Sequence, residues 1–402
     1  MKRDLFSILL SVLILSGYTA HAQWLTMYQT DTLVFDSEII QESFKLDISK
    51  PKTWNYTTGE VAWPLIILFD SYNEVTHRHN LATADVLTFH SQIPESILVG
   101  VPFNQYNRFY LTSNTIKAGD SLAGIEKMEK FLFDELIPYC VKNFQTNGPV
   151  ILLGHSRTGF LTSYLMVNRY RNFHMAGSFS SFLANRFETS DLITFLSERR
   201  SEYPFSYYFS AGSFTPEEEI YLTDLVQVRQ ILQSTPHDPA FQWHFMDHPY
   251  SGHMANYSRS VHVALTEYFG AFSKILSDWL FNKLSNDSLH QPVNVLKNDF
   301  ETLATELGAP VSPQPVHFIS IANSLQQNNR LADALSVLTY GMNLYGNDYD
   351  MNYYYIYCLA ASGFTEKAEA LIQQNMARIA TDPNLDPHEQ DMLQTDFRSI
   401  IQ

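Results

Sequence analysis

The stretch that most constrains the fold of this chain is PVILLGHSRTGF, residues 149–160. Residues 150–153 are all apolar, which is typical of a short strand buried inside a parallel sheet. Residues 154–159 then read as a tight turn, and the helical pattern LTSYLMVNRY begins directly after it. The sequence therefore predicts a buried strand, a turn with Ser156 at its apex, and a helix.

Strand, tight turn with serine and helix together make a nucleophile elbow, the strained turn that presents the serine of an α/β-hydrolase. The residues two positions before and after that serine are normally small, because the turn brings backbone segments close together. Gly154 meets this requirement, whereas Thr158 stands where the second glycine is expected and Gly159 follows it. A buried strand that ends in a glycine turn and a polar helix cap explains these residues equally well.

Apolar runs and helical patterns alternate on both sides of this elbow. The apolar runs that predict further strands lie at residues 64–70, 96–101, 174–180, 203–212 and 241–248. The helical patterns lie at residues 82–90, 122–144, 217–233 and 259–282, and residues 24–60 read as an N-terminal β segment. This alternation predicts an α/β fold with a doubly wound, mostly parallel sheet over residues 23–282.

The pattern changes beyond residue 283, where strands disappear and two helix pairs are expected at 316–344 and 350–379. Residues 329–334 align with residues 363–368 at an offset of 34, which is the period of tetratricopeptide repeats. Two such units are fewer than a free-standing stack needs, so we expect residues 283–402 to pack on the first domain. A plain helical cap is the alternative.

Composition and charge limit the kinds of molecule that the protein can be expected to bind. The formal net charge is −16 and no basic run occurs, which argues against nucleic acid and against an anionic membrane surface. Two cysteines, Cys140 and Cys358, lie in apolar helical patterns, and we expect both to be buried free thiols. A bridge between them would have to link the two regions.

The N-terminus reads as a secretory signal peptide over residues 1–22. Lys2 and Arg3 supply its positive end, residues 5–15 its apolar centre, and Ala20 and Ala22 its cleavage site. The apolar stretch is too short to span a bilayer, and no cysteine stands near the cleavage point to carry a lipid. We therefore expect a periplasmic or secreted protein without a membrane span.

A serine hydroxyl becomes a nucleophile when an imidazole takes its proton and an acid orients that imidazole. In α/β-hydrolases these groups follow in the order serine, acid, histidine, and the acid and the histidine each lie after a strand. His253 follows the run at 241–248 and precedes a helix, so it is the preferred base. His248 is its competitor, whereas His244 lies within the run and is expected to be a packed residue.

The acid is expected just after the run at 203–212. Glu217 is the first choice, Glu218 the second and Asp224 the third. Acidic residues after Pro216 also suit the start of a helix, because its dipole favours negative charge there. That explanation accounts for at least two of the three glutamates at 217–219.

The oxyanion that forms during acyl transfer needs backbone N–H donors. By topology we expect them at Arg157 and in the loop that contains Ser71 and Tyr72. His77 and His79 could form part of a metal site, but no third ligand is evident nearby. We expect neither a metal nor another cofactor.

Several segments together resemble the esterase family that includes esterase D and the periplasmic siderophore esterases. They are WPLIILFDSYNE, ILVGVPFNQYNRFYLTS, FLFDELIPYCVKNFQTNGPVILLGHSRTG and SGHMANYSRSVHVAL, within about residues 30–282. The resemblance implies that Ser156 is the nucleophile and His253 the base. It also implies that Asn104, Asn107 and Arg108 stand near the active site.

The chain departs from this family's pattern at three places. Thr158 replaces a glycine of the elbow, and Ser71 replaces the glycine of a Leu-Asp-Gly turn. Residues 179–184, FSSFLA, stand where the family has Ser-Pro-Ser-Leu-Trp-Trp and lines its pocket. The substrate can therefore differ from those of known members.

These observations predict an extracytoplasmic serine esterase that hydrolyses small-molecule or acylated-saccharide esters through an acyl-enzyme. The alternative is a hydrolase-like fold without activity that binds a protein partner through its C-terminal helices. The altered elbow and the three candidate acids keep this alternative open.

Overall fold

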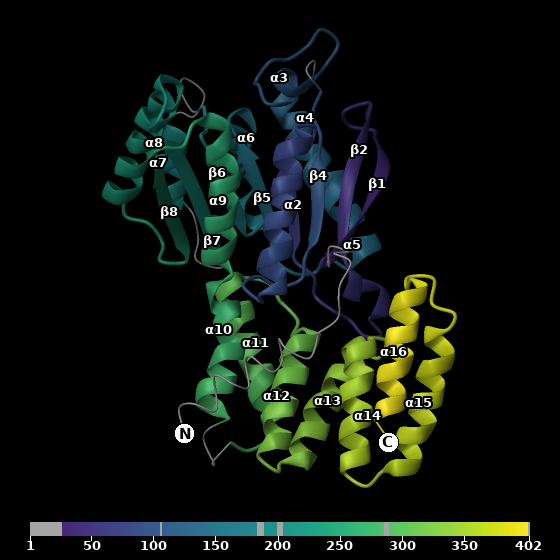
Figure 1. Cartoon of the computed structure of the whole chain (residues 1–402). Coiled ribbons are helices and arrows are strands. Elements are labelled where there is room, and N and C mark those ends of the chain that lie inside the picture. Colours follow the sequence, from purple (N-terminus) through teal and green to yellow (C-terminus); the bar gives the residue numbers. More distant parts are fainter. Residues whose placement is uncertain (1–25, 105–106, 183–188, 199–203, 285–288, 401–402) are drawn as a thin grey trace.

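An eight-stranded sheet forms the centre of the molecule, as the computed structural model of residues 26–104, 107–182, 189–198, 204–284 and 289–400 shows (Figure 1). The strand order is β1-β2-β4-β3-β5-β6-β7-β8. Strands β1 and β2 are antiparallel to each other, β2 is antiparallel to β4, and all other pairs are parallel. The predicted α/β fold with a mostly parallel sheet is confirmed. The strands are β1 (Tyr28–Ser37), β2 (Glu42–Pro51), β3 (Leu65–Phe69), β4 (Ile97–Val101), β5 (Val150–His155), β6 (Met175–Phe179), β7 (Phe205–Gly212) and β8 (Phe241–His248).

The central strands are buried on both faces, which explains why they appear in the sequence as unbroken apolar runs. Every residue of β3, β4, β5 and β6 is buried. Helix α6 packs on β5 and β6, and α9 packs on β5, β6 and β7. The helices that surround the sheet are α2 (Glu74–Phe89), α3 (Asn107–Leu111), α4 (Gly124–Lys130), α5 (Ile137–Phe144), α6 (Arg157–Arg169), α7 (Thr189–Glu198), α8 (Pro216–Ser234) and α9 (His253–Tyr268).

Two helices begin earlier than their apolar patterns suggested. Helix α2 begins at Glu74 rather than near residue 82, because the Asn73 side chain caps it by accepting the Thr76 N–H. Helix α9 begins at His253 rather than near residue 259. Both first turns carry polar side chains, so the apolar spacing marked only the later turns. The expected helix at 122–144 is continuous through α4, a π-helical stretch η2 (Phe131–Leu136) and α5.

The C-terminal region is entirely helical over its described residues. Helices α12 and α13 form one antiparallel pair and α14 and α15 another, each helix of the second pair lying 34 residues after its counterpart. Ala334 and Ala368, which the alignment paired, are both fully buried. The two expected helix pairs are thus confirmed. The bounds are α10 (Gly270–Asp278), η4 (Trp279–Lys283), α11 (Pro292–Leu307), α12 (Pro315–Gln327), α13 (Leu331–Tyr345), α14 (Tyr349–Ala361), α15 (Thr365–Ile379) and α16 (Pro387–Ser399).

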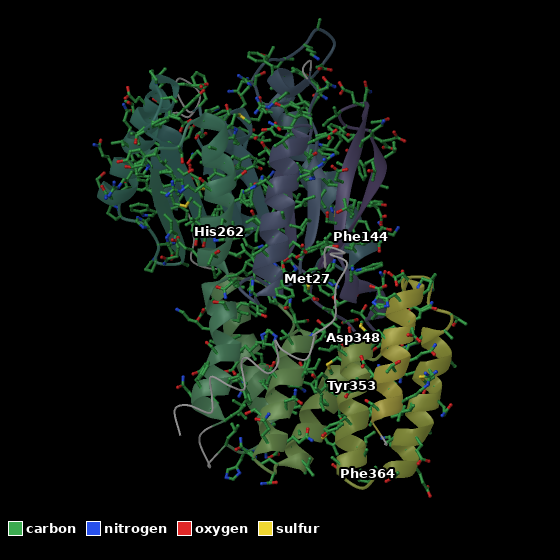
Figure 2. All side chains as sticks on the ribbon, in the orientation of Figure 1. Met27, Phe144, His262, Asp348, Tyr353 and Phe364 are labelled. Atoms are coloured by element: carbon green, nitrogen blue, oxygen red, sulfur yellow. The ribbon has the colours of Figure 1, made fainter. Side chains whose placement is uncertain are left out.

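This helical region packs against the segment that leads into β3. The Thr58 N–H donates to the Leu344 carbonyl at 2.8 Å, and the Ala62 N–H donates to Ser312 Oγ at 2.9 Å. Figure 1 shows the region at one end of the sheet, and Figure 2 places Asp348 at its near end and Phe364 at its far end. The helical region therefore contacts the amino ends of the parallel strands, as its short length led us to expect.

Two further expectations concerned the state of the cysteines and the presence of a membrane span. Cys140 and Cys358 are free and buried, as predicted. Among the described residues, no helix has the length and apolarity that crossing a bilayer requires. The expected signal peptide at residues 1–22 lies outside the described residues.

Two buried carboxyl groups lie where the helical region packs on the sheet domain, and the charge of one acts on the other. Glu95, just before β4, is 5% exposed, and Asp348, the N-cap of α14, is 8% exposed. Burial, with a smaller contribution from the negative charge of Asp348, raises the pKa of Glu95 to about 7 against the hydrogen bond that Thr53 donates. Burial also raises the pKa of Asp348 to about 7.

The raised pKa of Glu95 predicts that the folded protein loses stability as the pH rises. The folded chain holds the Glu95 proton to about pH 7, whereas the ordinary pKa of the group is 4.5. The unfolded chain therefore binds fewer protons between these values, and the free energy of unfolding falls across that window as pH rises. We expect Glu95→Gln to be more stable than wild type by roughly 1–3 kcal/mol at pH 8 and nearly equal at pH 5.

Urea unfolding at both pH values measures this difference. Glu60→Gln, at an exposed position of the contacting segment, is the matched control and should show no pH-dependent gain. A gain for Glu95→Gln that is the same at pH 5 and pH 8 would contradict the assignment.

Candidate active site

The residues singled out for catalysis follow the carboxyl ends of three parallel strands, β5, β7 and β8. Ser156 follows β5, Glu218 lies in the first turn of α8 after β7, and His253 is the first residue of α9 after β8. Parallel strands bring their carboxyl ends to one edge, which is where α/β folds place their sites. The candidate site is therefore at the edge opposite the helical region.

The strand, turn and helix predicted around Ser156 are present as β5, a single-residue turn and α6. Ser156 adopts φ +58° and ψ −116°, a strained conformation for a residue with a Cβ, and its N–H donates to the Phe179 carbonyl at 2.8 Å. A Cβ added at Gly154 would lie 2.2 Å from the Thr158 carbonyl oxygen. Only glycine fits at position 154, so that residue makes the sharp turn possible.

Thr158 fits the elbow because its side chain has partners of its own. The hydroxyl donates to the Asp70 carboxylate at 2.7 Å and accepts the His155 N–H at 2.9 Å. Thr158 is fully buried, and its backbone, not its side chain, closes on Gly154. The departure from glycine thus ties the elbow to the end of β3.

Asp70 and Arg108 complete this link. Asp70 follows β3 with φ +63°, and its carboxylate accepts from Arg108 Nε at 2.6 Å and Nη2 at 2.8 Å. Arg108 Nη2 also lies 3.3 Å from the His155 carbonyl oxygen. Burial opposes the charge of Arg108, but the hydrogen bonds and charge of Asp70 outweigh it and raise the pKa of Arg108. Arg108 is therefore beside the elbow, as expected, and is held there by Asp70.

His253 and Glu218 are in direct hydrogen-bonding contact. His253 Nδ1 lies 2.6 Å from Glu218 Oε1, and the Glu218 side chain is fully buried. The other carboxylate oxygen accepts from the Gly212 N–H at 2.6 Å and from Ser180 Oγ at 2.9 Å. Burial alone would raise the pKa of Glu218, but these hydrogen bonds, led by that of His253, hold it below its ordinary value. The acid is thus ionised and fixed in place.

The geometry favours Glu218 over the other candidate acids. Glu217 was preferred from the sequence, yet it is exposed on the neighbouring position of α8, and Asp224 lies farther along that helix. The competing histidines also have other surroundings. His248 is buried at the end of β8, and His244 Nδ1 lies 3.4 Å from Glu267.

Aromatic rings surround the His253 imidazole. The Tyr221 ring stacks on it with centroids 4.7 Å apart and planes 19° apart, and the His155 ring lies at 4.3 Å. Burial and the charge of Glu217 raise the pKa of the Tyr221 phenol, opposed by a side-chain hydrogen bond with Ser156. Ser156 and His253 therefore both contact Tyr221. The sequence analysis did not single out Tyr221, although it stands three residues after Glu218 on the same helix.

Arg108 was described above, and the other three residues expected at the oxyanion or substrate differ in their surroundings. The Ser71 N–H donates to the Val101 carbonyl at 3.3 Å, and Tyr72 is 52% exposed. Arg157 is the first residue of α6, a position whose N–H points out of the helix end. Its guanidinium stacks 4.0 Å from the Phe109 ring centroid.

The two histidines considered as a metal pair do not share a face. They lie on α2, where His77 is buried 3.4 Å from Asp47 and His79 is exposed. Within the described part of the chain, no three His, Cys, Asp or Glu side chains are grouped so that they could hold a metal ion.

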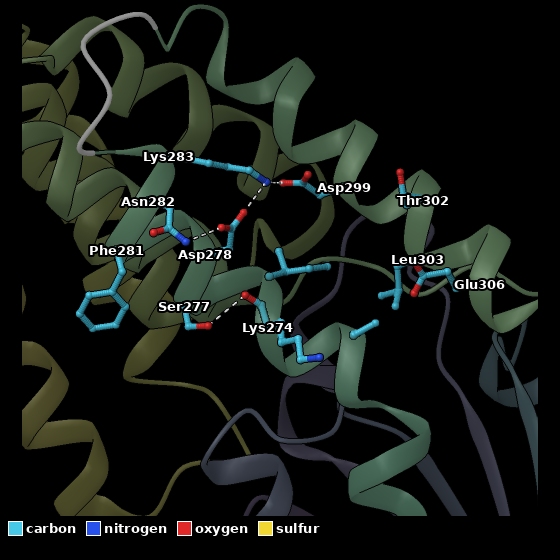
Figure 3. A pocket seen from close by; sticks show the side chains of 12 residues that line it. Lys274, Ser277, Asp278, Phe281, Asn282, Lys283, Asp299, Thr302, Leu303 and Glu306 are labelled. Atoms are coloured by element: carbon cyan, nitrogen blue, oxygen red, sulfur yellow. Dashed lines mark hydrogen bonds and ion pairs between the residues drawn. The ribbon is translucent and has the colours of Figure 1, made fainter.

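A cavity of about 540 Å³ lies elsewhere, between α10, η4 and α11 (Figure 3). Lys283 Nζ at its rim contacts Asp299 at 2.6 Å and Asp278 at 3.1 Å. None of the residues discussed for catalysis lines it. This cavity belongs to the helical region and is separate from the candidate active site.

An eight-stranded, mostly parallel sheet with a serine on a strained turn between β5 and α6 defines an α/β-hydrolase. The family model described as "Putative esterase" matches residues 37–245, and the chain belongs to that esterase family. A search of curated proteins finds no match.

Solved structures share the fold at low sequence identity. An uncharacterised protein from Capnocytophaga ochracea DSM 7271 has TM-score 0.59 and 18% identity, covering 93% of this chain and 99% of its own. An IroE-like serine hydrolase from Shewanella oneidensis has TM-score 0.59 and 16% identity, covering 77% of this chain and 97% of its own. The siderophore hydrolase EstB from Aspergillus nidulans has TM-score 0.50 and 13% identity, covering 59% of this chain and 94% of its own.

Proposed function

We propose that this esterase-family protein hydrolyses carboxylic esters through an acyl-enzyme, with Ser156 as nucleophile, His253 as general base and Glu218 as the acid that orients it. The observation that carries the proposal is the 2.6 Å contact between His253 and the buried Glu218, at the sheet edge where the strained Ser156 stands. Because Glu218 holds Nδ1, the other ring nitrogen, Nε2, is the one left for the serine.

The reaction follows from these roles. Ser156 Oγ bonds to the ester carbonyl carbon while its proton passes to His253 Nε2, and the carbonyl electrons move to oxygen. The carbon–oxygen bond to the alcohol then breaks, and the alcohol leaves with the proton from His253. Water repeats the sequence on the acyl-enzyme and releases the carboxylic acid. The N–H groups of Arg157 and of the loop at Ser71 and Tyr72 are the proposed donors to the oxyanion.

The substrate is a small-molecule or acylated-saccharide ester. The similarity to EstB, a siderophore hydrolase, adds a siderophore ester to the compounds that should be assayed. Residues 1–22 are proposed to direct the protein to the periplasm or the outside of the cell. We place the division between the esterase domain and the helical region at residues 282 and 283. The 34-residue spacing of the helix pairs favours a tetratricopeptide-like region, a candidate for binding a protein partner.

A fluorophosphonate probe tests the nucleophile independently of the substrate, because it reacts with an activated serine of any serine hydrolase. We expect the wild type to be labelled at Ser156, and Ser277→Ala, an exposed serine of α10, to be labelled equally well. Ser156→Ala should not be labelled. A folded wild type without label would instead favour the inactive binding module.

A further inference from the structure

We propose that the ring of Tyr221 stabilises the protonated imidazole of His253 during catalysis, so that Tyr221 is a positioning and charge-stabilising residue of this site. This inference rests on the proposed function, since it needs His253 to act as the base. It assigns a role to a side chain that neither the elbow nor the acid predicts.

The Tyr221 and His253 rings are nearly parallel, 19° apart, with centroids at 4.7 Å, so the phenol ring covers a face of the imidazole. The His253 side chain is only 14% exposed. The Phe182 ring meets Tyr221 edge-on at 6.2 Å and supports it from another direction. Contacts therefore hold the phenol ring over the imidazole.

Helix α8 supplies two of the contacts to the His253 ring. Thr215 caps the helix by accepting the Glu218 N–H, and Pro216 occupies its first position. Residues three apart lie on the same helix face, so Glu218 and Tyr221 point the same way. Glu218 binds the edge of the imidazole at Nδ1, and Tyr221 covers its face. One helical turn thus fixes the ring in position and orientation.

When Ser156 attacks, its proton passes to His253 and the neutral imidazole becomes a cation. A cation over the face of a tyrosine ring is attracted by the ring's quadrupole, and more strongly where water is excluded. The attraction is larger in the transition state than in the resting enzyme, where the imidazole is neutral. An interaction of that kind raises kcat rather than substrate affinity.

Other charged and titratable groups near His253 are accounted for. The charge of Glu218 is the main partner of the imidazolium. Burial lowers the pKa of His155 to about 3, so its ring is neutral. The charge of Arg108 is paired with Asp70. Glu217 is exposed on the outer side of α8.

The experiment compares Tyr221→Leu, Tyr221→Phe and Ile220→Ala in the full-length protein, with hydrolysis of a short-chain aryl ester measured from pH 5 to pH 9. Ile220 is exposed on the same helix and is the matched control. We expect Tyr221→Leu to lower kcat by about 3- to 30-fold with little change in KM. The acidic limb of its kcat/KM profile should move to lower pH, because the protonated ring has lost a partner. Tyr221→Phe keeps the ring face and loses the hydroxyl that bonds Ser156, so it should keep the acidic limb of wild type and lose less kcat than Tyr221→Leu. Ile220→Ala should match wild type in both measures.

Two results would overturn the role proposed for the Tyr221 ring, and a third would overturn the proposed function instead. Equal losses in Tyr221→Leu and Tyr221→Phe would overturn the proposal, because the hydroxyl and not the ring would then matter. An unmoved acidic limb in Tyr221→Leu would overturn it as well, since lost packing alone does not move that limb. Failure of the proposed function gives a different result: Ser156→Ala would hydrolyse the ester as fast as wild type, whatever Tyr221 does.

Discussion

Ser156→Ala is expected to lower kcat for a short-chain aryl ester by roughly 10⁵- to 10⁶-fold, the size of effect seen when a serine nucleophile is removed. Among the described residues, Ser156 is the one that occupies the strained turn after β5. Its removal leaves no other hydroxyl at that position to attack the ester. Continuous spectrophotometry of the released phenol measures the rate, and the residual activity should come from binding and oxyanion donors alone.

The alanine variant should fold normally. Alanine carries the same Cβ as serine at φ +58°, so the backbone strain of the elbow is unchanged. Its melting temperature should therefore match that of the wild type. Equal rates in the two proteins would remove Ser156 as the nucleophile.

The second large effect is expected at the acid. Glu218→Gln keeps the size of the side chain but removes the negative charge that stabilises the imidazolium and accepts the Nδ1 proton's hydrogen bond. We expect kcat to fall by roughly 10³- to 10⁴-fold, as in other triads whose acid becomes an amide. Single-turnover and steady-state rates on the same aryl ester measure it.

Glu217→Gln is the matched control for that variant. It changes an identical residue one position earlier, where the side chain is exposed, and should leave kcat within about twofold because exposed charges act weakly through water. Similar losses in both variants would show that the buried contact to His253 does not define the acid.

The strands at the centre of the sheet domain could be predicted because they are buried on both faces. Leu65–Phe69 and Ile97–Val101 contain only apolar residues and glycine, a pattern that few other structures produce. The elbow was also predictable, since strand, serine turn and helix are contiguous in the chain. Ser156 was chosen from that local order, and His253 from its place after the last predicted strand of the sheet domain.

The acid could not be chosen in the same way. Glu217, Glu218 and Glu219 follow Pro216 as equals, and each suits the first turn of a helix. The helix start at Thr215 and the packing of α8 on β7 decide which one faces His253. These contacts depend on the tertiary fold, which is why the neighbouring residue was preferred.

Thr158 illustrates the same limit. Its replacement of glycine looked like crowding because only its neighbours in sequence were considered. Its partner Asp70 lies 88 residues earlier and reaches it through the pairing of β3 with β5. The Thr158 hydroxyl, which is unexpected at this position, makes hydrogen bonds that hold the elbow together.

The attachment of the helical region at the amino ends of the strands leaves the catalytic edge uncovered by it. A partner of the proposed kind on these helices and an ester in the proposed site would not compete for the same surface. Anchoring the protein through its C-terminal helices would then orient the reactive edge outward, toward the surrounding medium. An immobilised form attached in this way should keep its full turnover.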